Sequence, residues 1–385
     1  MSLQMSGLDC HRAGVSLRER LAFSREQIAK LLDWLKSQPG VEGCVLLSTC
    51  NRTEVYISGA PETDPWRLLC LGAGQAEAPF APFFTTRIGE AAAEHLMEVA
   101  CGLHSQILGE DQIITQVRVA LELAQARNAA DPVLASLFRH AVTAGKRAKT
   151  EIKVSRDVPS MGTRCREILE EELGGLEGKH ILVIGNGQMG RLAAELLHKA
   201  GANVQVTLRT YRHGETVVPS GCGTVPYEAR LAALEGADAL VSATTSPHYT
   251  LTLEQLRSLK NTPKIAMDLA VPRDIDPDCV QILKLYDTDA LGTGTPGTVQ
   301  ELSDIRAIAR DELDRFYQWQ RRQTAAEKRL RFPLFIDLSG KTVVLIGGGT
   351  IAARRIGSLR LFGCRIRVVS PELKCSAEGL TWEAR

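Results

Sequence analysis

The sequence lacks the features that mark secreted, membrane-spanning and disulfide-stabilised proteins. Its first residues contain no uninterrupted apolar run of the signal-peptide type, and no stretch is long enough to cross a bilayer as a helix. No two of its ten cysteines form a C-x-x-C pair, and a secreted disulfide scaffold would be much shorter than 385 residues. These absences favour a reducing cytoplasm, where most cysteines serve as small buried apolar side chains.

The chain also has almost no excess charge. Its 46 Lys and Arg residues nearly balance 45 Asp and Glu residues, which gives a net charge of +1. It therefore shows no global basic field of the kind that nucleic-acid-binding proteins often carry. A nucleic-acid partner is still compatible with this balance, because a local basic face can occur on a neutral protein.

A chain of this length is expected to form two or three domains within the α/β class. Residues 1–154 mix short strands with amphipathic helices, which predicts an α+β domain. Val41–Leu47 and Glu54–Ser58 are predicted strands that flank a tight turn. Ser24–Ser37 is a predicted helix, since Ser24 is a favourable N-cap and apolar residues recur at helical spacing behind it.

In residues 155–297 strands and helices alternate, which predicts a parallel sheet with helices on both faces. The strand Lys179–Ile184 runs directly into GNGQMG, and this segment opens a helix. A G-x-G-x-x-G segment in that context is typical of a Rossmann-type dinucleotide-binding domain. Its members are the predicted phosphate-binding residues: Gly185, Asn186, Gly187, Gln188, Met189 and Gly190.

The end of the second strand of this domain indicates which nicotinamide cofactor is preferred. An NAD-binding enzyme usually carries an acidic residue there for the ribose hydroxyls, whereas this chain has Leu208, Arg209 and Thr210. A guanidinium and a hydroxyl suit a 2′-phosphate, so the sequence favours NADPH. The alternative is that Arg209 is an ordinary solvated surface residue.

A long polar helix and a second glycine-rich unit follow. Residues 298–332 are a predicted linker, whose long helix runs from Val299 to about Leu330 and ends before Pro333. Residues 333–385 then repeat the strand, Gly-rich turn, helix and strand pattern, with strands at Lys341–Ile346 and Arg365–Ser370. One βαβ unit is too little for a complete sheet, so we expect a partial Rossmann-like unit.

The candidate chemistry lies in the turn Ser48-Thr49-Cys50-Asn51-Arg52 between the first two predicted strands. A cation beside a cysteine lowers the pKa of its thiol and favours the reactive thiolate. With a nicotinamide domain downstream, such a thiolate could attack an acyl group, and hydride could then reduce the thioester to an aldehyde. From the residues alone, the alternative of one more buried cysteine is equally open.

Several segments together resemble the glutamyl-tRNA reductase family, from about Leu3 to Tyr317. They read CHRAGVSLRERLAF, LSTCNRTEVY, GLHSQILGEDQIITQV, GNGQMG and MDLAVPRDID. The resemblance implies NADPH-dependent conversion of glutamyl-tRNA to glutamate-1-semialdehyde, the first step of the C5 route to porphyrins and other tetrapyrroles. It also implies that Cys50 displaces the tRNA 3′-oxygen and carries the glutamyl group as a thioester.

The same resemblance assigns the other site residues. His95 would assist proton transfer or orient the ester, although a lone histidine on an amphipathic helix is more often structural. His11 and His104 are expected to be non-catalytic. The residues that would line the substrate pocket are Thr49, Asn51, Arg52, Ser105, Glu110, Asp111, Gln112 and Gln116. Suggested partners are glutamyl-tRNA, the downstream glutamate-1-semialdehyde aminotransferase and a second copy of the chain.

Two regions depart from the family pattern. Val154–Gly162 lacks the usual small-residue stretch, and the family's helical dimerisation domain is absent beyond Arg321. The segment after Pro333 instead resembles the start of the precorrin-2 dehydrogenase domain of siroheme synthases, with Gly347, Gly349 and Ala352 in its phosphate turn. Because that segment holds only one βαβ unit, we expect no complete dehydrogenase activity from it.

Two other functions remain open on the residues alone. A generic NADP-dependent dehydrogenase acting on a small carbonyl compound would need no nucleophilic cysteine. A non-catalytic regulator that binds tRNA or a tetrapyrrole would keep the fold without turnover. The Cys50 turn, His95 and GNGQMG together favour the reductase. No cluster of His, Cys and carboxylate residues has metal-ligand spacing, so no metal is expected.

Overall fold

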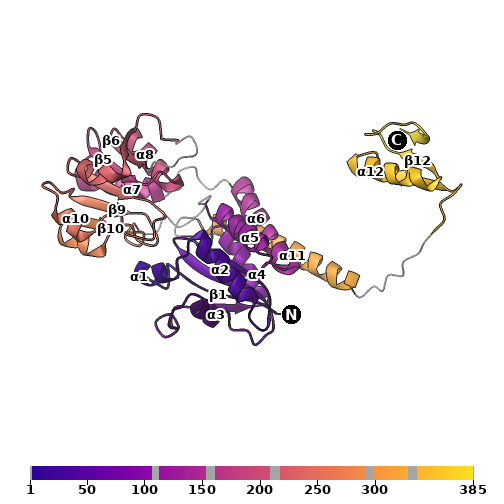
Figure 1. The fold of residues 1–385 in the computed structure, drawn as a ribbon, viewed down its shortest axis with the longest axis horizontal. Coiled ribbons are helices and arrows are strands. Elements are labelled where there is room, and N and C mark those ends of the chain that lie inside the picture. Colours follow the sequence, from indigo (N-terminus) through magenta and orange to yellow (C-terminus); the bar gives the residue numbers. More distant parts are fainter. Residues whose placement is uncertain are drawn as a thin grey trace. The chain divides into compact units, whose positions relative to one another are not determined.

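A computed structural model describes residues 2–105, 112–152, 161–208, 217–291, 298–327 and 336–384 (Figure 1). The chain divides into two compact units, residues 1–322 and 323–385. The first unit contains an antiparallel sheet and a six-stranded parallel sheet, and the second contains a three-stranded parallel sheet. These sheets confirm the predicted mixed α/β class.

The antiparallel sheet has the order β2-β3-β1-β4. Its strands are β1 (Ser2–Asp9), β2 (Val41–Ser48), β3 (Arg52–Gly59) and β4 (Thr85–Ile88). Strand β3 is buried along its whole length, because β1 and β2 pair with its two edges and helices cover it. The turn of interest, residues 49–51, therefore leads into the most buried strand of this sheet.

Helices pack around this sheet and build the largest hydrophobic core. Helix α2 (Arg25–Lys36) begins with the predicted N-cap, since Ser24 forms a reciprocal capping box with Gln27. The other helices of this region are α1 (Val15–Arg18), the 3₁₀ turn η1 (Glu19–Leu21), α3 (Pro65–Gly72), α4 (Glu90–Ala100), α5 (Gln112–Ala126) and α6 (Pro132–Glu151).

The parallel sheet has the order β10-β9-β8-β5-β6-β7, the doubly wound order of Rossmann-type domains. Its strands are β5 (His180–Ile184), β6 (Asn203–Leu208), β7 (Gly223–Pro226), β8 (Ala239–Ser242), β9 (Ile265–Asp268) and β10 (Lys284–Tyr286). One face packs on α7 (Met161–Leu173) and α8 (Gln188–Lys199). The other packs on η2 (Tyr227–Ala229), α9 (Arg230–Leu234), α10 (Leu253–Arg257) and η3 (Pro277–Gln281).

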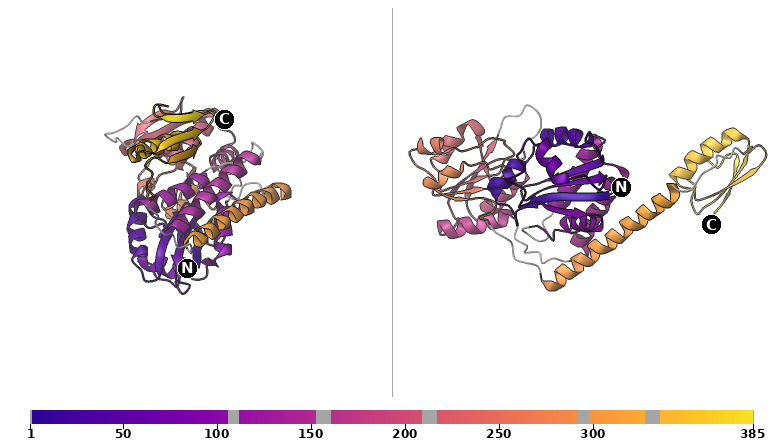
Figure 2. Two further views of the ribbon diagram at one scale, coloured as in Figure 1. Left: turned by 90° about the vertical axis from the view of Figure 1, so that its right-hand side faces the viewer. Right: turned by 90° about the horizontal axis from the view of Figure 1, so that it is seen from below.

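The predicted linker helix is α11 (Val299–Glu327), a single long helix (Figure 2). Its predicted last residues, 328–330, lie outside the described residues. Ile305, Leu313 and Phe316 join the core of the antiparallel-sheet region. The buried Glu312 accepts a hydrogen bond from Arg147 on α6 at 2.8 Å, so α11 is attached by both apolar and ionic contacts.

The C-terminal unit contains β11 (Thr342–Ile346), α12 (Thr350–Leu359), η4 (Arg360–Phe362), β12 (Arg365–Val369) and β13 (Leu380–Glu383). The order is β11-β12-β13, with parallel pairing throughout. We expected one βαβ unit, and the additional strand β13 corrects this. Its four residues are too short a signal to be read as a strand from local pattern. Among helices within the described ranges, none is long and apolar enough to cross a membrane.

Candidate active site

The Cys50 turn is held by its own backbone and by Thr49. The Thr49 N–H donates to Arg52 O at 2.9 Å, and the Thr49 hydroxyl accepts the N–H groups of Asn51 and Arg52 at 3.2 and 3.1 Å. Across the sheet edge, the Cys10 N–H donates to Asn51 O at 2.9 Å. These bonds fix a short, well-defined loop with the half-buried Cys50 at its tip.

Burial separates Cys50 from most other cysteines of the chain. Desolvation raises the pKa of Cys44, Cys101 and Cys165 to about 12, so these thiols stay protonated and unreactive near neutrality. No disulfide joins any of the ten cysteines, all of which lie in the described ranges. Cys50 instead stands on a polar loop, two residues before Arg52, the arginine that begins β3.

Beneath the turn lies a buried ionic network centred on Glu54. Arg52 Nη1 donates to Glu54 Oε1 at 2.7 Å, and His95 Nε2 lies 2.9 Å from the same oxygen. The Tyr56 hydroxyl donates to Glu54 Oε2 at 2.7 Å. Burial alone would raise the pKa of Glu54, but His95 and Arg52 hold it well below its usual value. The carboxylate is therefore the fixed negative centre of the site.

His95 combines a fixed orientation with an unused ring nitrogen. Its ring is buried, and Nε2 is taken by Glu54. Within the described part of the chain, His95 Nδ1 has no hydrogen-bond partner. A buried polar atom without a partner costs free energy unless a ligand or water satisfies it. This is the arrangement expected of a histidine held ready for a substrate, rather than of a purely structural one.

His104, expected to be non-catalytic, is part of the same cluster. Its ring lies 4.9 Å from that of His95 between centroids. Its carbonyl oxygen accepts a hydrogen bond from Arg52, and its Nε2 lies 2.8 Å from Glu98 Oε2. The hydrogen bond with His104 is the main cause of the lowered pKa of Glu98. His104 therefore ties helix α4 to the arginine next to the nucleophile candidate.

The remaining predicted substrate residues are distributed over three segments. Asn51 is buried in the Cys50 turn, and its Oδ1 has no hydrogen-bond partner among the described residues. Ser105 follows His104 directly, and Gln112 and Gln116 are half-buried on the first turns of α5. Glu110 and Asp111 lie outside the described residues.

Glu54 and Tyr56 are site residues that the sequence analysis missed. The available signal was a charged residue inside TEVYIS, a strand whose apolar content predicts burial. A buried carboxylate requires partners, so Glu54 marks an ion pair even before its partners are known.

The glycine-rich turn after β5 fits a dinucleotide pyrophosphate. Gly185 has a φ of +111°, and a Cβ there would overlap the carbonyl oxygen of Ala243. A Cβ on Gly190 would overlap Gly185 O, so glycine permits the close packing of α8 on the turn. At Gly187 a Cβ would meet no described atom within 4 Å, which leaves the N-terminus of α8 open to an anion.

Asn186 supports the same assignment. Its Nδ2 donates to Val217 O at 3.0 Å, while its buried Oδ1 has no partner in the part of the chain that the structure describes. An unpartnered polar atom beside an open helix N-terminus suits a bound polar ligand. Arg209 and Thr210, predicted to contact the 2′-phosphate, lie outside the described residues.

The loops at the carboxyl ends of β8 and β9 are braced by two acidic side chains. Asp274 accepts hydrogen bonds from the Ser242 hydroxyl and the Thr244 N–H at 2.8 and 2.7 Å. Asp268 accepts the N–H groups of Asp274 and Ile275 at 2.9 and 2.8 Å. These side chains hold the loops in shape, which favours loop packing over direct cofactor contact for Asp268.

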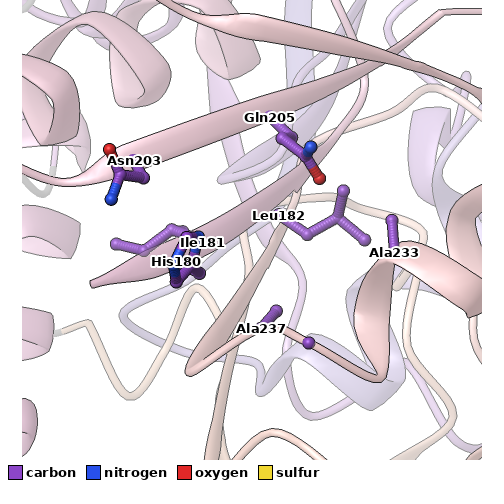
Figure 3. Close-up of a pocket in the computed structure, with 8 residues that line it drawn as sticks. His180, Ile181, Leu182, Asn203, Gln205, Ala233 and Ala237 are labelled. Carbon is purple, nitrogen blue, oxygen red and sulfur yellow. The ribbon is translucent and has the colours of Figure 1, made fainter. Parts of the chain in front are cut away.

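A hollow lies beside the first residues of β5 and β6, and Figure 3 shows the side chains that line it. It is lined by His180 and Asn203, the first residues of β5 and β6, by Ala233 of α9 and by Ala237 just before β8. Ligands of open α/β sheets bind outside the carboxyl ends of the strands. This hollow is therefore distinct from the dinucleotide site at the glycine-rich turn.

Comparison with known proteins agrees with the geometry. The glutamyl-tRNA reductase N-terminal domain family matches residues 6–152. A relative named glutamyl-tRNA reductase, from Acetivibrio thermocellus, is 38% identical over 83% of this chain and 97% of its own length. The chain belongs to the glutamyl-tRNA reductase family. This confirms the resemblance inferred from the sequence motifs.

Other matches cover the downstream parts of the chain or most of its length. The shikimate/quinate 5-dehydrogenase family matches residues 167–293, and an NAD(P)-binding family matches residues 334–385. The Ruminiclostridium josui protein named probable multifunctional siroheme biosynthesis protein HemA is 41% identical over 97% of this chain and 76% of its own length. The solved glutamyl-tRNA reductase from Methanopyrus kandleri is 31% identical over 82% of this chain and 75% of that one, with a TM-score of 0.38.

Proposed function

We propose that this chain reduces glutamyl-tRNA to glutamate-1-semialdehyde with NADPH through a thioester on Cys50, as the first step of porphyrin biosynthesis. The observation that carries the proposal is the position of Cys50. It stands on a turn that runs directly into Arg52, and Arg52 is bonded to the buried Glu54–His95 pair. Family membership supplies the substrate, because the relatives are named for glutamyl-tRNA.

In the first step the Cys50 sulfur attacks the ester carbonyl carbon. A carbon–sulfur bond forms, the bond to the tRNA 3′-oxygen breaks, and that oxygen takes up a proton. Arg52 has five N–H donors, more than Glu54 and His104 require, so it can serve the network and a substrate carboxylate together. We assign it the glutamate carboxylate, with Thr49 and Asn51 shaping the turn around the ester. Further pocket residues are proposed to be Ser105, Glu110, Asp111, Gln112 and Gln116.

His95 is the proposed proton donor to the departing 3′-oxygen. Glu54 fixes the ring through Nε2, which leaves Nδ1 as the nitrogen that faces no protein partner among described residues. A histidine oriented by a carboxylate is a common device for general acid–base catalysis, because the carboxylate stabilises the protonated ring. The same geometry would let the neutral ring accept a proton from the Cys50 thiol beforehand.

NADPH, when bound, would supply the hydride that converts the thioester to the aldehyde and returns the Cys50 sulfur to its thiolate form. The turn from Gly185 to Gly190 would hold the pyrophosphate through the backbone N–H groups of α8, with Asn186, Gln188 and Met189 beside it. Arg209 and Thr210 are proposed to favour NADPH over NADH by contacting the 2′-phosphate.

The domain roles follow from these assignments. Residues 1–154 would bind glutamyl-tRNA and carry the nucleophile, residues 155–297 would bind NADPH, and residues 298–332 would link them to the C-terminal unit. Residues 333–385 would be a partial precorrin-2 dehydrogenase-like unit without complete activity of its own. A cytoplasmic location, a homodimer and transfer of the reactive aldehyde to its aminotransferase are further parts of the proposal.

A single-turnover assay with glutamyl-tRNA carrying labelled glutamate tests the proposal. Without NADPH, wild-type protein should retain label after denaturation, and adding NADPH should release it as semialdehyde. Cys50→Ser should retain no label, whereas Cys10→Ser, a matched half-buried cysteine whose thiol has no assigned role, should behave like wild type. A Cys50→Ser variant that still forms aldehyde would support the generic dehydrogenase instead. Intact tRNA binding with no label on the wild-type protein would support the non-catalytic regulator.

A further inference from the structure

Arg18 is a buried side chain between the Cys50 turn and the nicotinamide-binding domain. It ends the short helix α1 and is 2% exposed. On the catalytic side, its Nε donates to the carbonyl oxygen of Cys50 at 3.3 Å, and its Nη1 donates to Ala13 O at 2.7 Å. Arg18 thus contacts the backbone of the proposed nucleophile itself.

The other side of the Arg18 guanidinium meets the loop after β10. Arg18 Nη2 donates to the Thr288 hydroxyl at 3.4 Å, and Nη1 lies 2.8 Å from Asp289 Oδ1. This pair is an ion pair rather than an aligned hydrogen bond, since Asp289 Oδ1 has no hydrogen-bond partner among the described residues. Asp289 Oδ2 meanwhile accepts the N–H of Val15, the first residue of α1, at 2.7 Å. Asp289 therefore holds both ends of α1.

A second ion pair joins the same two regions without touching the Cys50 turn. Glu19, next to Arg18, accepts hydrogen bonds from Arg273 Nη2 and Nε at 2.6 and 2.9 Å. The Arg273 N–H also donates to Glu19 at 3.3 Å. Two contacts of this kind on adjacent residues mark 15–19 as a docking segment for the nicotinamide-binding domain.

Burial makes the Arg18 contacts energetically significant. A guanidinium removed from water needs partners on all sides, and losing one leaves an uncompensated buried charge. Its partners come from both the catalytic and the nicotinamide-binding domain, so a movement of the partners in one domain also displaces Arg18 relative to those in the other. A change in the position of the loop at Thr288 and Asp289 must therefore reach the carbonyl of Cys50.

We infer that Arg18 is a positioning residue that couples docking of the nicotinamide-binding domain to the orientation of the Cys50 turn. The inference rests on the proposed role of Cys50 as the thioester carrier. Reduction needs the thioester carbonyl and the hydride donor in one alignment, and small errors in such alignment cost large factors in rate. Arg18 provides a direct mechanical link between the two parts that must align.

The two half-reactions separate this role from a purely structural one. Acylation by glutamyl-tRNA without NADPH needs only the catalytic domain, whereas discharge of the thioester needs both domains. Asp289→Asn removes the ion pair between Arg18 and the nicotinamide-binding domain. The rate of thioester discharge should then fall on the order of tenfold to a hundredfold, while the rate of acylation changes little. Arg18→Gln also loses the Cys50 carbonyl contact, so both steps should slow. Arg18→Lys keeps the positive charge but loses the planar set of N–H donors. Compared with Arg18→Gln, it should restore the acylation rate more than the discharge rate.

A double variant and a matched control complete the design. The Arg18→Gln/Asp289→Asn double variant should discharge no more slowly than Arg18→Gln, because both changes break one link. Arg127→Gln breaks an exposed pair with Asp33 within the catalytic domain and should leave both steps unchanged. An Asp289→Asn protein that discharges at the wild-type rate, or effects that add fully in the double variant, would overturn the inference. Failure of wild-type acylation would instead refute the proposed function of Cys50.

Discussion

Replacing Glu54 by glutamine should destabilise the protein strongly, because this buried carboxylate faces three partners at once. The change leaves Arg52 buried without its counter-ion and weakens the bonds to His95 and Tyr56. Breaking a buried ion pair from one side typically costs about 3–5 kcal/mol. Domains are stable by about 5–15 kcal/mol, so the loss should be a large fraction of the total.

The effect should also depend on pH in a defined direction. The pKa of Glu54 is lower in the folded protein than in the unfolded chain, despite burial, because His95 and Arg52 stabilise the carboxylate. The folded state therefore gains stability that is fully present above the unfolded pKa of about 4.3 and is lost as pH falls toward the native value. The difference between wild type and Glu54→Gln should thus be largest near neutrality and shrink below about pH 4.

Urea unfolding followed by circular dichroism at several pH values would measure this difference. Glu122→Gln is the matched control, since Glu122 pairs with Arg118 on the exposed surface of α5 and should change stability by about 0.5 kcal/mol or less. A loss below about 1 kcal/mol for Glu54→Gln at neutral pH would refute the reasoning, because it falls outside the range for a broken buried pair. A difference that does not vary with pH would refute the electrostatic part alone.

Three further predictions concern the site and its supports. His95→Asn should lower the single-turnover rate by about 10²–10⁴-fold without unfolding the protein, as expected for a general acid, and an unchanged pH–rate profile would contradict this. Gly190→Val should abolish NADPH binding in a fluorescence titration, because its side chain would overlap Gly185 O, whereas Gly236→Ala, with open space around it, should bind normally. Phe316→Ala should cost about 3–5 kcal/mol of unfolding free energy, since that ring is buried between α11 and the catalytic core; protease resistance of α11 equal to wild type would argue against it.

The features that the sequence predicted well are those with a local cause. The Ser24 cap and the glycine turn at Gly185–Gly190 depend on residues within a few positions of each other, so their signals survive in the linear sequence. The strand predicted at Lys179–Ile184 is observed as β5 (His180–Ile184), because a short apolar run before a glycine turn is also a local signal. The roles of individual site residues came from the family resemblance and stay predictions.

The features that were missed depend on pairing across the fold. Ser2–Asp9 was not predicted as a strand, because its apolar and polar residues alternate only weakly and Gly7 interrupts them. In the structure Gly7 lies opposite Glu54, and a Cβ on Gly7 would lie 2.5 Å from Glu54 Cγ. The residue that weakens the local strand signal is therefore the one that makes room for the buried carboxylate.

This pairing explains how one cysteine among ten acquires a distinct environment. Strand β1 covers one edge of β3, and its glycine admits Glu54, which contacts both His95 and Arg52, the residue that ends the Cys50 turn. Arg18, on the short helix that follows β1 in the chain, donates to the Cys50 carbonyl. The Cys50 turn is thus held directly by Arg18, and through Arg52 it is joined to a network that includes His95 and the Glu54 pocket opened by Gly7. Local pattern can locate the cysteine, but only the folded sheet shows why that cysteine is suited to the chemistry.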